Sequence, residues 1–101
     1  MQQGPYIDFI VKTSNQEHSS IIIKRNEKLL RLDINTMQVI KSQEVTATHG
    51  ARSAIVVDGK LFVSYKNKSL YVYDSWSLKE LFSVHTGIDI ARVFHHFYDA
   101  S

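Results

Sequence analysis

The side chains best suited to chemistry are five histidines and ten carboxylates, and they form no arrangement typical of catalysis. The chain has no cysteine and therefore no thiolate nucleophile. It also contains no Gly-x-Ser-x-Gly turn, no glycine-rich phosphate loop and no His-Glu-x-x-His pair. Because such spacings bring nucleophiles, bases and metal ligands together, their absence from the sequence predicts a protein that is not an enzyme.

The best candidate for a metal cluster is the pair His95 and His96 with Asp99. On a strand, neighbouring side chains point to opposite faces, so both imidazoles cannot reach one ion. On a helix, one imidazole could pair with Asp99, but two ligands are too few for a structural zinc site. The sequence therefore predicts no metal site and no cofactor. His49 and His85 precede glycine-containing turns and are expected to bond to loop backbone.

Two aspartates, Asp33 and Asp74, stand at the same place in two similar turns, each followed by Thr36 or Ser77. A short carboxylate at such a position can accept backbone N–H groups and close the turn. We therefore expect both aspartates to be structural rather than a general acid and base.

Basic residues cluster at two further turns and are the first candidates for partner binding. They are Lys24, Arg25 and Lys28 around Asn26, and Lys66 and Lys68 around Asn67, with Tyr65 nearby. If the two turns lie at one end of the fold, their charges could attract an acidic peptide, phosphate groups or an anionic membrane surface. The alternative is that these lysines only keep exposed turns soluble, and Glu27 interrupts the cluster.

The aromatic residues are expected mainly to pack in a core. Tyr71, Tyr73 and Phe82 lie in strand-like runs, and no single-strand nucleic-acid motif accompanies them. The net charge of +2 is also too balanced to indicate nucleic-acid binding. Trp76 lies in a turn, so we expect it to be a contact residue for a protein partner.

The length of 101 residues predicts a single domain, and short strand-like runs fill most of it. We expect strands over 6–11, 20–24, 29–34, 37–42, 52–57, 60–65, 69–73 and 78–84. No apolar run exceeds four residues, as in Ala54–Val57, so no transmembrane helix is expected. The lack of cysteine agrees with an intracellular protein of the cytoplasm or nucleus.

The two halves of the chain resemble each other when one is moved by 41 positions. Asn26 then falls on Asn67, Asp33 on Asp74, and Ile21 and Ile22 on Phe62 and Val63, without a gap from Ser20 to Ile40. The predicted repeat units are residues 6–46 and 51–84, with an extra strand or helix over 88–98. A period near 41 is typical of the four-stranded units of β-propellers.

The sequence resembles the WD-repeat family in its third-strand segment. That family ends this strand with an aromatic residue and Asp, as in Leu70-Tyr71-Val72-Tyr73-Asp74, and Leu29–Asp33 is a weaker copy. The family's Gly-His pair before the first strand is missing, which departs from the pattern. The resemblance implies an all-β fold of two four-stranded antiparallel propeller-like blades plus a C-terminal segment, forming an incomplete ring.

Two blades cannot close a ring of four to eight. We therefore expect a homo-oligomer of three or four copies, a chain that completes a partner's ring, or a part of a longer protein. The predicted function is a non-enzymatic protein–protein interaction or scaffold module. A structural subunit that only fills a larger assembly is a further hypothesis.

The main rival fold is a self-contained β-barrel of the pleckstrin-homology type, capped by a C-terminal helix over 89–98, and a sandwich or another barrel is a further alternative. Its function would be the binding of anionic lipid or phosphate headgroups through the lysine-rich turns. A helix over that segment favours the barrel, and a strand favours the blades.

Overall fold

The computed structural model describes residues 7–14, 19–45 and 50–85, and these residues form an all-β structure. The eight strands are β1 (Ile7–Ser14), β2 (Ser19–Arg25), β3 (Lys28–Asp33), β4 (Val39–Glu44), β5 (Ala51–Val57), β6 (Lys60–Tyr65), β7 (Ser69–Asp74) and β8 (Glu80–His85). The expectation of short strands separated by polar turns is confirmed. The segment 88–98 lies outside the described residues.

The strands form two antiparallel sheets in which each strand pairs with its neighbours in sequence. The first sheet has the order β1-β2-β3-β4 and the second the order β5-β6-β7-β8. Both sheets are open, so the described residues do not form the closed barrel of the rival prediction. In this part of the chain no helix is long and apolar enough to cross a membrane.

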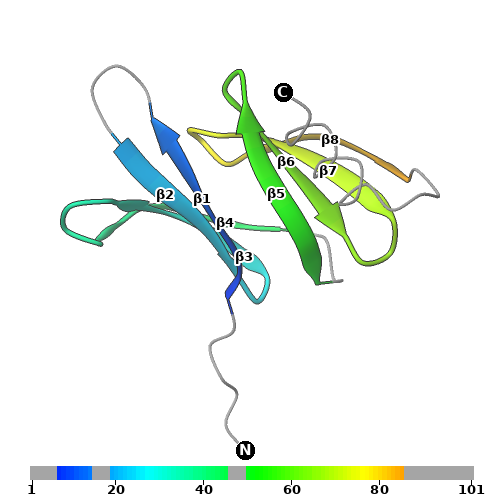
Figure 1. Ribbon diagram of the computed structural model, residues 1–101, viewed down its shortest axis with the longest axis horizontal. Helices are drawn as coiled ribbons and strands as arrows, with labels where there is room; N and C mark the ends of the chain where they lie inside the picture. Colours follow the sequence, from blue (N-terminus) through cyan, green and yellow to red (C-terminus); the bar gives the residue numbers. More distant parts are fainter. Residues whose placement is uncertain (1–6, 15–18, 46–49, 86–101) are drawn as a thin grey trace, which may run out of the picture.

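The first strands of the two sheets, β1 and β5, lie side by side and run in the same direction (Figure 1). Each carries a bulge near its start, at Asp8 in β1 and at Arg52 in β5. The bulges bend the two strands at equivalent places, because an extra residue locally increases the twist of a strand.

The β7–β8 turn of the second sheet repeats the β3–β4 turn of the first sheet at the predicted spacing of 41 residues. In the β3–β4 turn, the amide of Met37 donates to the carbonyl of Asp33 at 2.7 Å. In the β7–β8 turn, the amide of Leu78 donates to the carbonyl of Asp74 at 2.9 Å. Met37 and Leu78 also share a left-handed backbone, with φ angles of 61° and 66°.

The predicted match of the two halves without a gap is wrong by one residue, because the β2–β3 and β6–β7 corners differ in length. Arg25 pairs with Lys28, so only Asn26 and Glu27 form the β2–β3 corner. Lys66, Asn67 and Lys68 form the β6–β7 corner, which is one residue longer.

We call two residues counterparts when they hold the same place in the two sheets. The extra residue in the β6–β7 corner moves the counterpart of each β2 residue by one place, from a spacing of 41 to a spacing of 40. Ile22 pairs with Arg31 as Phe62 pairs with Val72, so the counterpart of Ile22 is Phe62 and not Val63. The Asn26 and Asn67 corners are therefore not equivalent in backbone. In the first corner Asn26 itself has the positive φ of 57°, whereas in the second Lys68 does, at 66°.

The sheets pack against each other through one face each, and we call this region the inter-sheet core. The first sheet contributes Ile22 and Leu29, with Phe9, Val11 and Val45 beside them. The second sheet contributes Ala51, Leu61, Val63, Tyr65, Tyr73 and Leu78, with Ala54, Val56 and Tyr71 beside them. Burial of these side chains is the main stabilising contribution that joins the sheets.

Unlike faces of the two sheets meet in this core. Leu29 of β3 faces the second sheet, but its counterpart Leu70 of β7 lies on the opposite face from the core residue Tyr73. Conversely, Tyr73 faces the first sheet, whereas its counterpart Leu32 lies on the opposite face from Leu29. The sheets therefore stack front to back, and each keeps an outer face.

Candidate interaction surfaces

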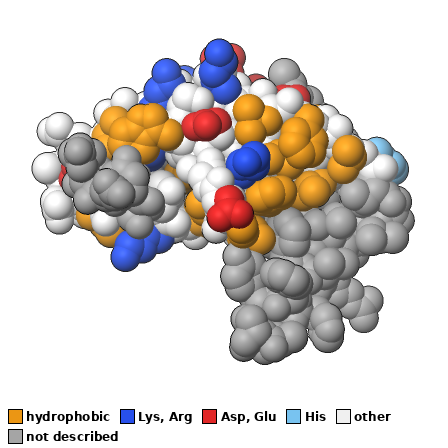
Figure 2. Space-filling view, turned by 90° about the horizontal axis from the view of Figure 1, so that it is seen from above, with side chains coloured by type: hydrophobic (Ala, Val, Ile, Leu, Met, Phe, Trp, Pro, Cys, Tyr) orange, Lys and Arg blue, Asp and Glu red, His pale blue; other side chains and the backbone are white. Residues whose placement is uncertain are grey.

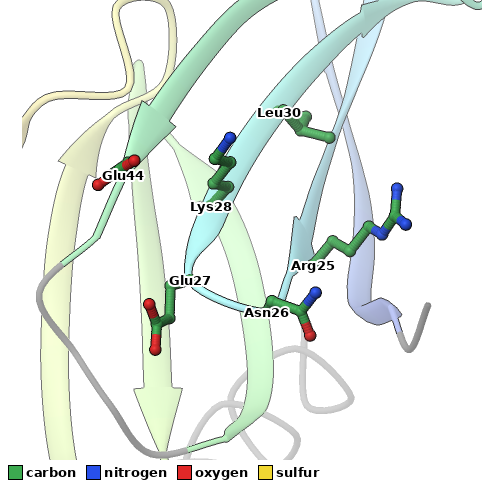
Figure 3. Close-up of a pocket in the computed structure, with 6 residues that line it drawn as sticks. All are labelled: Arg25, Asn26, Glu27, Lys28, Leu30 and Glu44. Carbon is green, nitrogen blue, oxygen red and sulfur yellow. The ribbon is translucent and has the colours of Figure 1, made fainter. Parts of the chain in front are cut away.

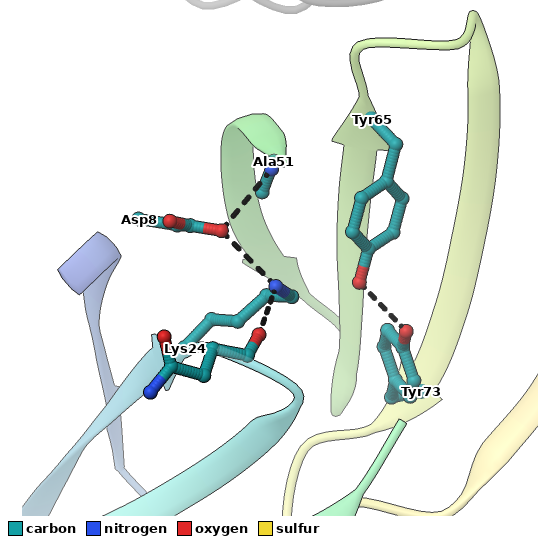
Figure 4. A network of polar contacts seen from close by, with 6 residues as sticks. Asp8, Lys24, Ala51, Tyr65 and Tyr73 are labelled. Atoms are coloured by element: carbon teal, nitrogen blue, oxygen red, sulfur yellow. Dashed lines mark hydrogen bonds and ion pairs between the residues drawn. The ribbon is translucent and has the colours of Figure 1, made fainter. Parts of the chain in front are cut away.

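The ammonium of Lys24 is buried beside the inter-sheet core, with a side chain only 3% exposed (Figure 4). Its Nζ donates to Asp8 Oδ2 at 3.0 Å and to the Asn26 carbonyl at 2.6 Å. The same Asp8 oxygen accepts the backbone N–H of Ala51 at 3.2 Å. Asp8 therefore connects both sheets, and Lys24 cannot belong to an exposed basic surface.

Tyr65 is buried next to this ion pair. Lys24 Nζ lies 5.7 Å from the centre of the Tyr65 ring, within the range of a cation–π contact. The hydroxyls of Tyr65 and Tyr73 are 2.8 Å apart. Burial raises the pKa of Tyr65 to about 12 and raises the pKa of Tyr73 still further. Both phenols therefore stay neutral, and Tyr65 is also out of reach of a partner.

The other predicted basic residues are exposed. Arg25 and Lys28 flank the β2–β3 corner, and Lys66 and Lys68 belong to the β6–β7 corner. Both corners lie at the lower end of the molecule in Figure 1. The structure thus brings four of the five cations to one end, because β2 and β6 both finish there.

A shallow depression of about 370 Å³ lies at the first of these corners (Figure 3). Arg25, Lys28 and Glu44 are directly opposite one another on three strands, so they share a face with Leu30. Asn26 and Glu27 complete its lining. Two carboxylates offset the two cations, so the depression does not select strongly for anions.

Trp76 lies in the β7–β8 turn and remains 44% exposed. The guanidinium of Arg31 from the first sheet stacks on its ring at 3.7 Å. Burial lowers the pKa of Arg31, and the neighbouring carboxylate of Asp74 opposes that shift. Arg31 Nε and Nη1 are buried without a hydrogen-bond partner. Trp76 is therefore a link between the sheets as well as a surface residue.

The two predicted turn aspartates close their turns in the same way. Asp33 Oδ1 accepts the amides of Asn35 at 2.7 Å and Thr36 at 3.0 Å. Asp74 Oδ1 accepts the amides of Trp76 and Ser77, both at 2.8 Å. The amides of Ser77 and Trp76 hold the pKa of the Asp74 carboxyl below its usual value. Asn67 also caps its corner by accepting the Ser69 amide at 3.2 Å.

The outer face of the first sheet carries an apolar surface that sequence analysis did not identify as a binding site. It consists of Ile10, Ile21, Ile23, Leu30, Leu32 and Val39, which alternate with the side chains of the inter-sheet core. Ile10 at 61% and Val39 at 55% are the most exposed of them. The depression lies at one end of this face.

The outer face of the second sheet is also apolar. It consists of Ile55, Val57, Phe62, Leu70, Val72, Phe82 and Val84. Val72 is fully buried, whereas Phe82 and Val84 on β8 are 51% and 46% exposed. Figure 2 shows hydrophobic side chains gathered on the side where Figure 1 places the second sheet, with single charged groups among them.

Sequence reasoning missed these faces because they depend on the length of one corner. A one-residue change in register moves every side chain of a strand to the other face. With the expected spacing of 41 for β2, Ile22 and Val63 would be counterparts, and the front-to-back stacking would not have been apparent. The apolar runs Ile21–Ile23 and Leu61–Val63 indicated only that both faces of these strands need cover.

The histidines do not form a site in the described part of the chain. His85 ends β8 and is exposed. The other four, His18, His49, His95 and His96, lie outside the described residues, as does Asp99. Within residues 7–14, 19–45 and 50–85, no group of three or more His, Cys, Asp or Glu side chains could hold a metal ion.

Neither a protein-family model nor a curated protein matches this chain. Its function must therefore be argued from its residues and their geometry.

Proposed function

We propose that the chain is a non-enzymatic protein-interaction module whose two sheets are blades of a β-propeller, an architecture like that of WD-repeat proteins. The observation that carries the proposal is the front-to-back stacking of two four-stranded meanders. In a sandwich with two-fold symmetry, the same face of both sheets is buried in the interface. Such a sandwich has no second copy of either buried face left to bind a further sheet. Front-to-back stacking leaves one face of each kind outside the inter-sheet core, so it can continue.

The composition of the outer faces supports a protein as the partner. Soluble proteins rarely leave contiguous apolar patches exposed unless these contact another molecule. Ile10, Val39, Phe82 and Val84 are each about half exposed or more on faces that otherwise resemble a core. Covering them would gain about 25 cal/mol for each Å² of apolar surface removed from water.

The exposed cations Arg25, Lys28, Lys66 and Lys68 provide the observation in favour of the second function, binding to anionic lipid or phosphate headgroups. Surface cations near a membrane contribute about 1 kcal/mol each. Glu27 and Glu44, which line the same depression as Arg25 and Lys28, reduce that attraction. We therefore favour the apolar faces as the functional surface.

Site-specific photo-crosslinking in the cells that produce the protein tests the proposal. A photoreactive phenylalanine at Val39 or at Phe82 samples the two outer faces, and one at Thr36 in the exposed β3–β4 turn is the matched control. We expect covalent adducts with protein from the two face positions and none from Thr36. Equal labelling from all three positions, or none from the faces, would contradict an interaction function for these surfaces.

Vesicle sedimentation distinguishes the lipid-binding alternative from the proposed protein interaction. Vesicles containing phosphatidylserine should leave the protein in the supernatant at physiological ionic strength. Salt-sensitive sedimentation that is lost in an Arg25→Glu, Lys66→Glu variant would instead support headgroup binding and weigh against the proposal.

A further inference from the structure

The two outer faces are the two halves of an interface that the chain already contains once. The face of the first sheet that is buried in the inter-sheet core has the outer face of the second sheet as its counterpart. The buried face of the second sheet has the outer face of the first sheet as its counterpart. Each outer face keeps exposed apolar side chains, Ile10 and Val39 on the first sheet and Phe82 and Val84 on the second. A second copy can therefore supply each half to the other.

Resting on the proposed function, we propose that copies of this chain assemble head to tail, with the outer face of the second sheet packed on the outer face of the first sheet of the next copy. The contact is heterologous, because it joins two different surfaces. It extends the stacking already seen between β1–β4 and β5–β8. Rings of four to eight blades correspond to two to four copies of two sheets each.

The contacts expected between two copies can be inferred from the contacts in the inter-sheet core, by replacing each core residue with its counterpart on the other sheet. There, Leu29 belongs to one buried cluster with Tyr65, and the partly buried Tyr71 packs against it. The counterpart of Leu29 is Leu70, which is half-buried on β7. The counterparts of Tyr65 and Tyr71 are Arg25 and Leu30, which line the depression. Leu70 of one copy therefore enters the depression of the next.

The smaller side chains on the outer face of the first sheet suit this arrangement. In the inter-sheet core the second sheet contributes the large rings of Tyr65 and Tyr71, and the first sheet contributes the smaller side chains of Ile22 and Leu29. On the outer faces the sizes are reversed. Leu30 stands where the second sheet has Tyr71, and Phe62 stands where the first sheet has Ile22. A larger side chain on one face thus compensates for a smaller one on the other.

Light scattering coupled to size-exclusion chromatography tests the assembly with one charged substitution on each face. The wild-type protein should have a mass of two to four chains at high concentration. Ile10→Glu on the first sheet and Phe82→Glu on the second should each abolish closed rings. Met37→Glu, in the exposed β3–β4 turn, is the control and should keep the wild-type mass.

Mixing the two variants distinguishes head-to-tail contacts from contacts between like faces. Ile10→Glu keeps its second sheet intact, and Phe82→Glu keeps its first sheet intact, so together they should form a dimer of one chain of each. A wild-type protein that remains a single chain at every concentration would overturn the proposal. So would a mixture that stays monomeric while the wild type assembles.

Disulfide trapping keeps the test independent of the stability of the charged variants. The natural chain has no cysteine, so Leu30→Cys and Leu70→Cys introduce a single thiol each. When the two variants are mixed and oxidised, we expect mainly mixed dimers. Predominant Leu30–Leu30 or Leu70–Leu70 products would contradict head-to-tail packing.

Failure of this inference can be distinguished from failure of the proposed function. A protein that is monomeric in isolation but gives crosslinks from Val39 or Phe82 to other proteins would overturn self-assembly alone. The same monomer without crosslinks from either face would overturn both.

Discussion

At the scale of single residues, the buried pair of Lys24 and Asp8 shows how neighbouring groups decide whether a charge is inside or outside. The sequence placed Lys24 with Arg25 and Lys28 in one basic cluster. The structure separates them, because Lys24 points toward Asp8 across β1 and β2 while Arg25 points to the other face. Alternation along a strand predicts that separation, but only after the register is known.

Removing one partner of this ion pair should destabilise the protein strongly. Asp8→Asn leaves the Lys24 ammonium buried without a carboxylate, so we expect the free energy of unfolding to fall by about 3 kcal/mol. Urea unfolding of Asp8→Asn, Lys24→Met and the double variant measures the coupling. The double variant should lose less than the sum of the two, and strict additivity would contradict a direct interaction. Lys28→Met, at an exposed lysine of the same hairpin, is the control.

The turn carboxylate Asp74 should make stability depend on pH. Its pKa is lowered in the folded protein, so its stabilising contribution is complete above the usual value of 3.8 and is lost as the pH falls through the folded pKa. Asp74→Asn keeps an oxygen acceptor but has no charge to titrate. The stability difference between wild type and Asp74→Asn, measured in urea at several pH values, should shrink on acidification. A difference that is constant with pH would contradict this role, and Glu44→Gln is the control.

At the scale of elements, the corners determine the orientation of the strands they join. Asp58 and Gly59 form the two-residue β5–β6 turn, in the gap between the expected strands 52–57 and 60–65, with φ angles of 50° and 75°. The Asn26 and Asn67 corners looked equivalent in sequence but differ by one residue. Corner length is not apparent from composition, because Lys, Asn and Glu are all acceptable turn residues.

Substitution of Gly59 tests the requirement for a left-handed backbone in the β5–β6 turn. Gly59→Ala should lower the free energy of unfolding by about 1 kcal/mol, since an L-residue pays a steric penalty at this φ. No atom lies within 4 Å of the added Cβ, so the effect would come from the backbone alone.

Gly50→Ala is the matched control for this substitution. Its Cβ would meet only the flexible end of the Lys66 side chain at 3.4 Å, and its φ is not positive. Thermal unfolding should show a clear loss for the first variant and little change for the second. Equal losses would contradict the backbone explanation.

At the scale of the whole molecule, the inter-sheet core should make the two sheets unfold together. Leu61 is fully buried in that core, and truncating it leaves a cavity against both sheets. We expect Leu61→Ala to cost about 2–5 kcal/mol and to speed amide exchange in β2 as much as in β6. Leu81→Ala, on exposed β8, should change neither. Faster exchange confined to the second sheet would mean that the sheets fold independently.

The sequence by itself determined the all-β class, the eight strands and the Asp33 and Asp74 turns. These follow from local chemistry: side-chain alternation, turn residues and backbone preference act over a few residues. Only the tertiary structure decided which face of each sheet is covered, because one additional residue in the β6–β7 corner reverses the orientation of a whole strand. It also decided that Lys24 and Tyr65 are interior while Arg25, Lys28, Lys66 and Lys68 are at the surface. Burial of a charge depends on a partner from another strand, which no local pattern identifies.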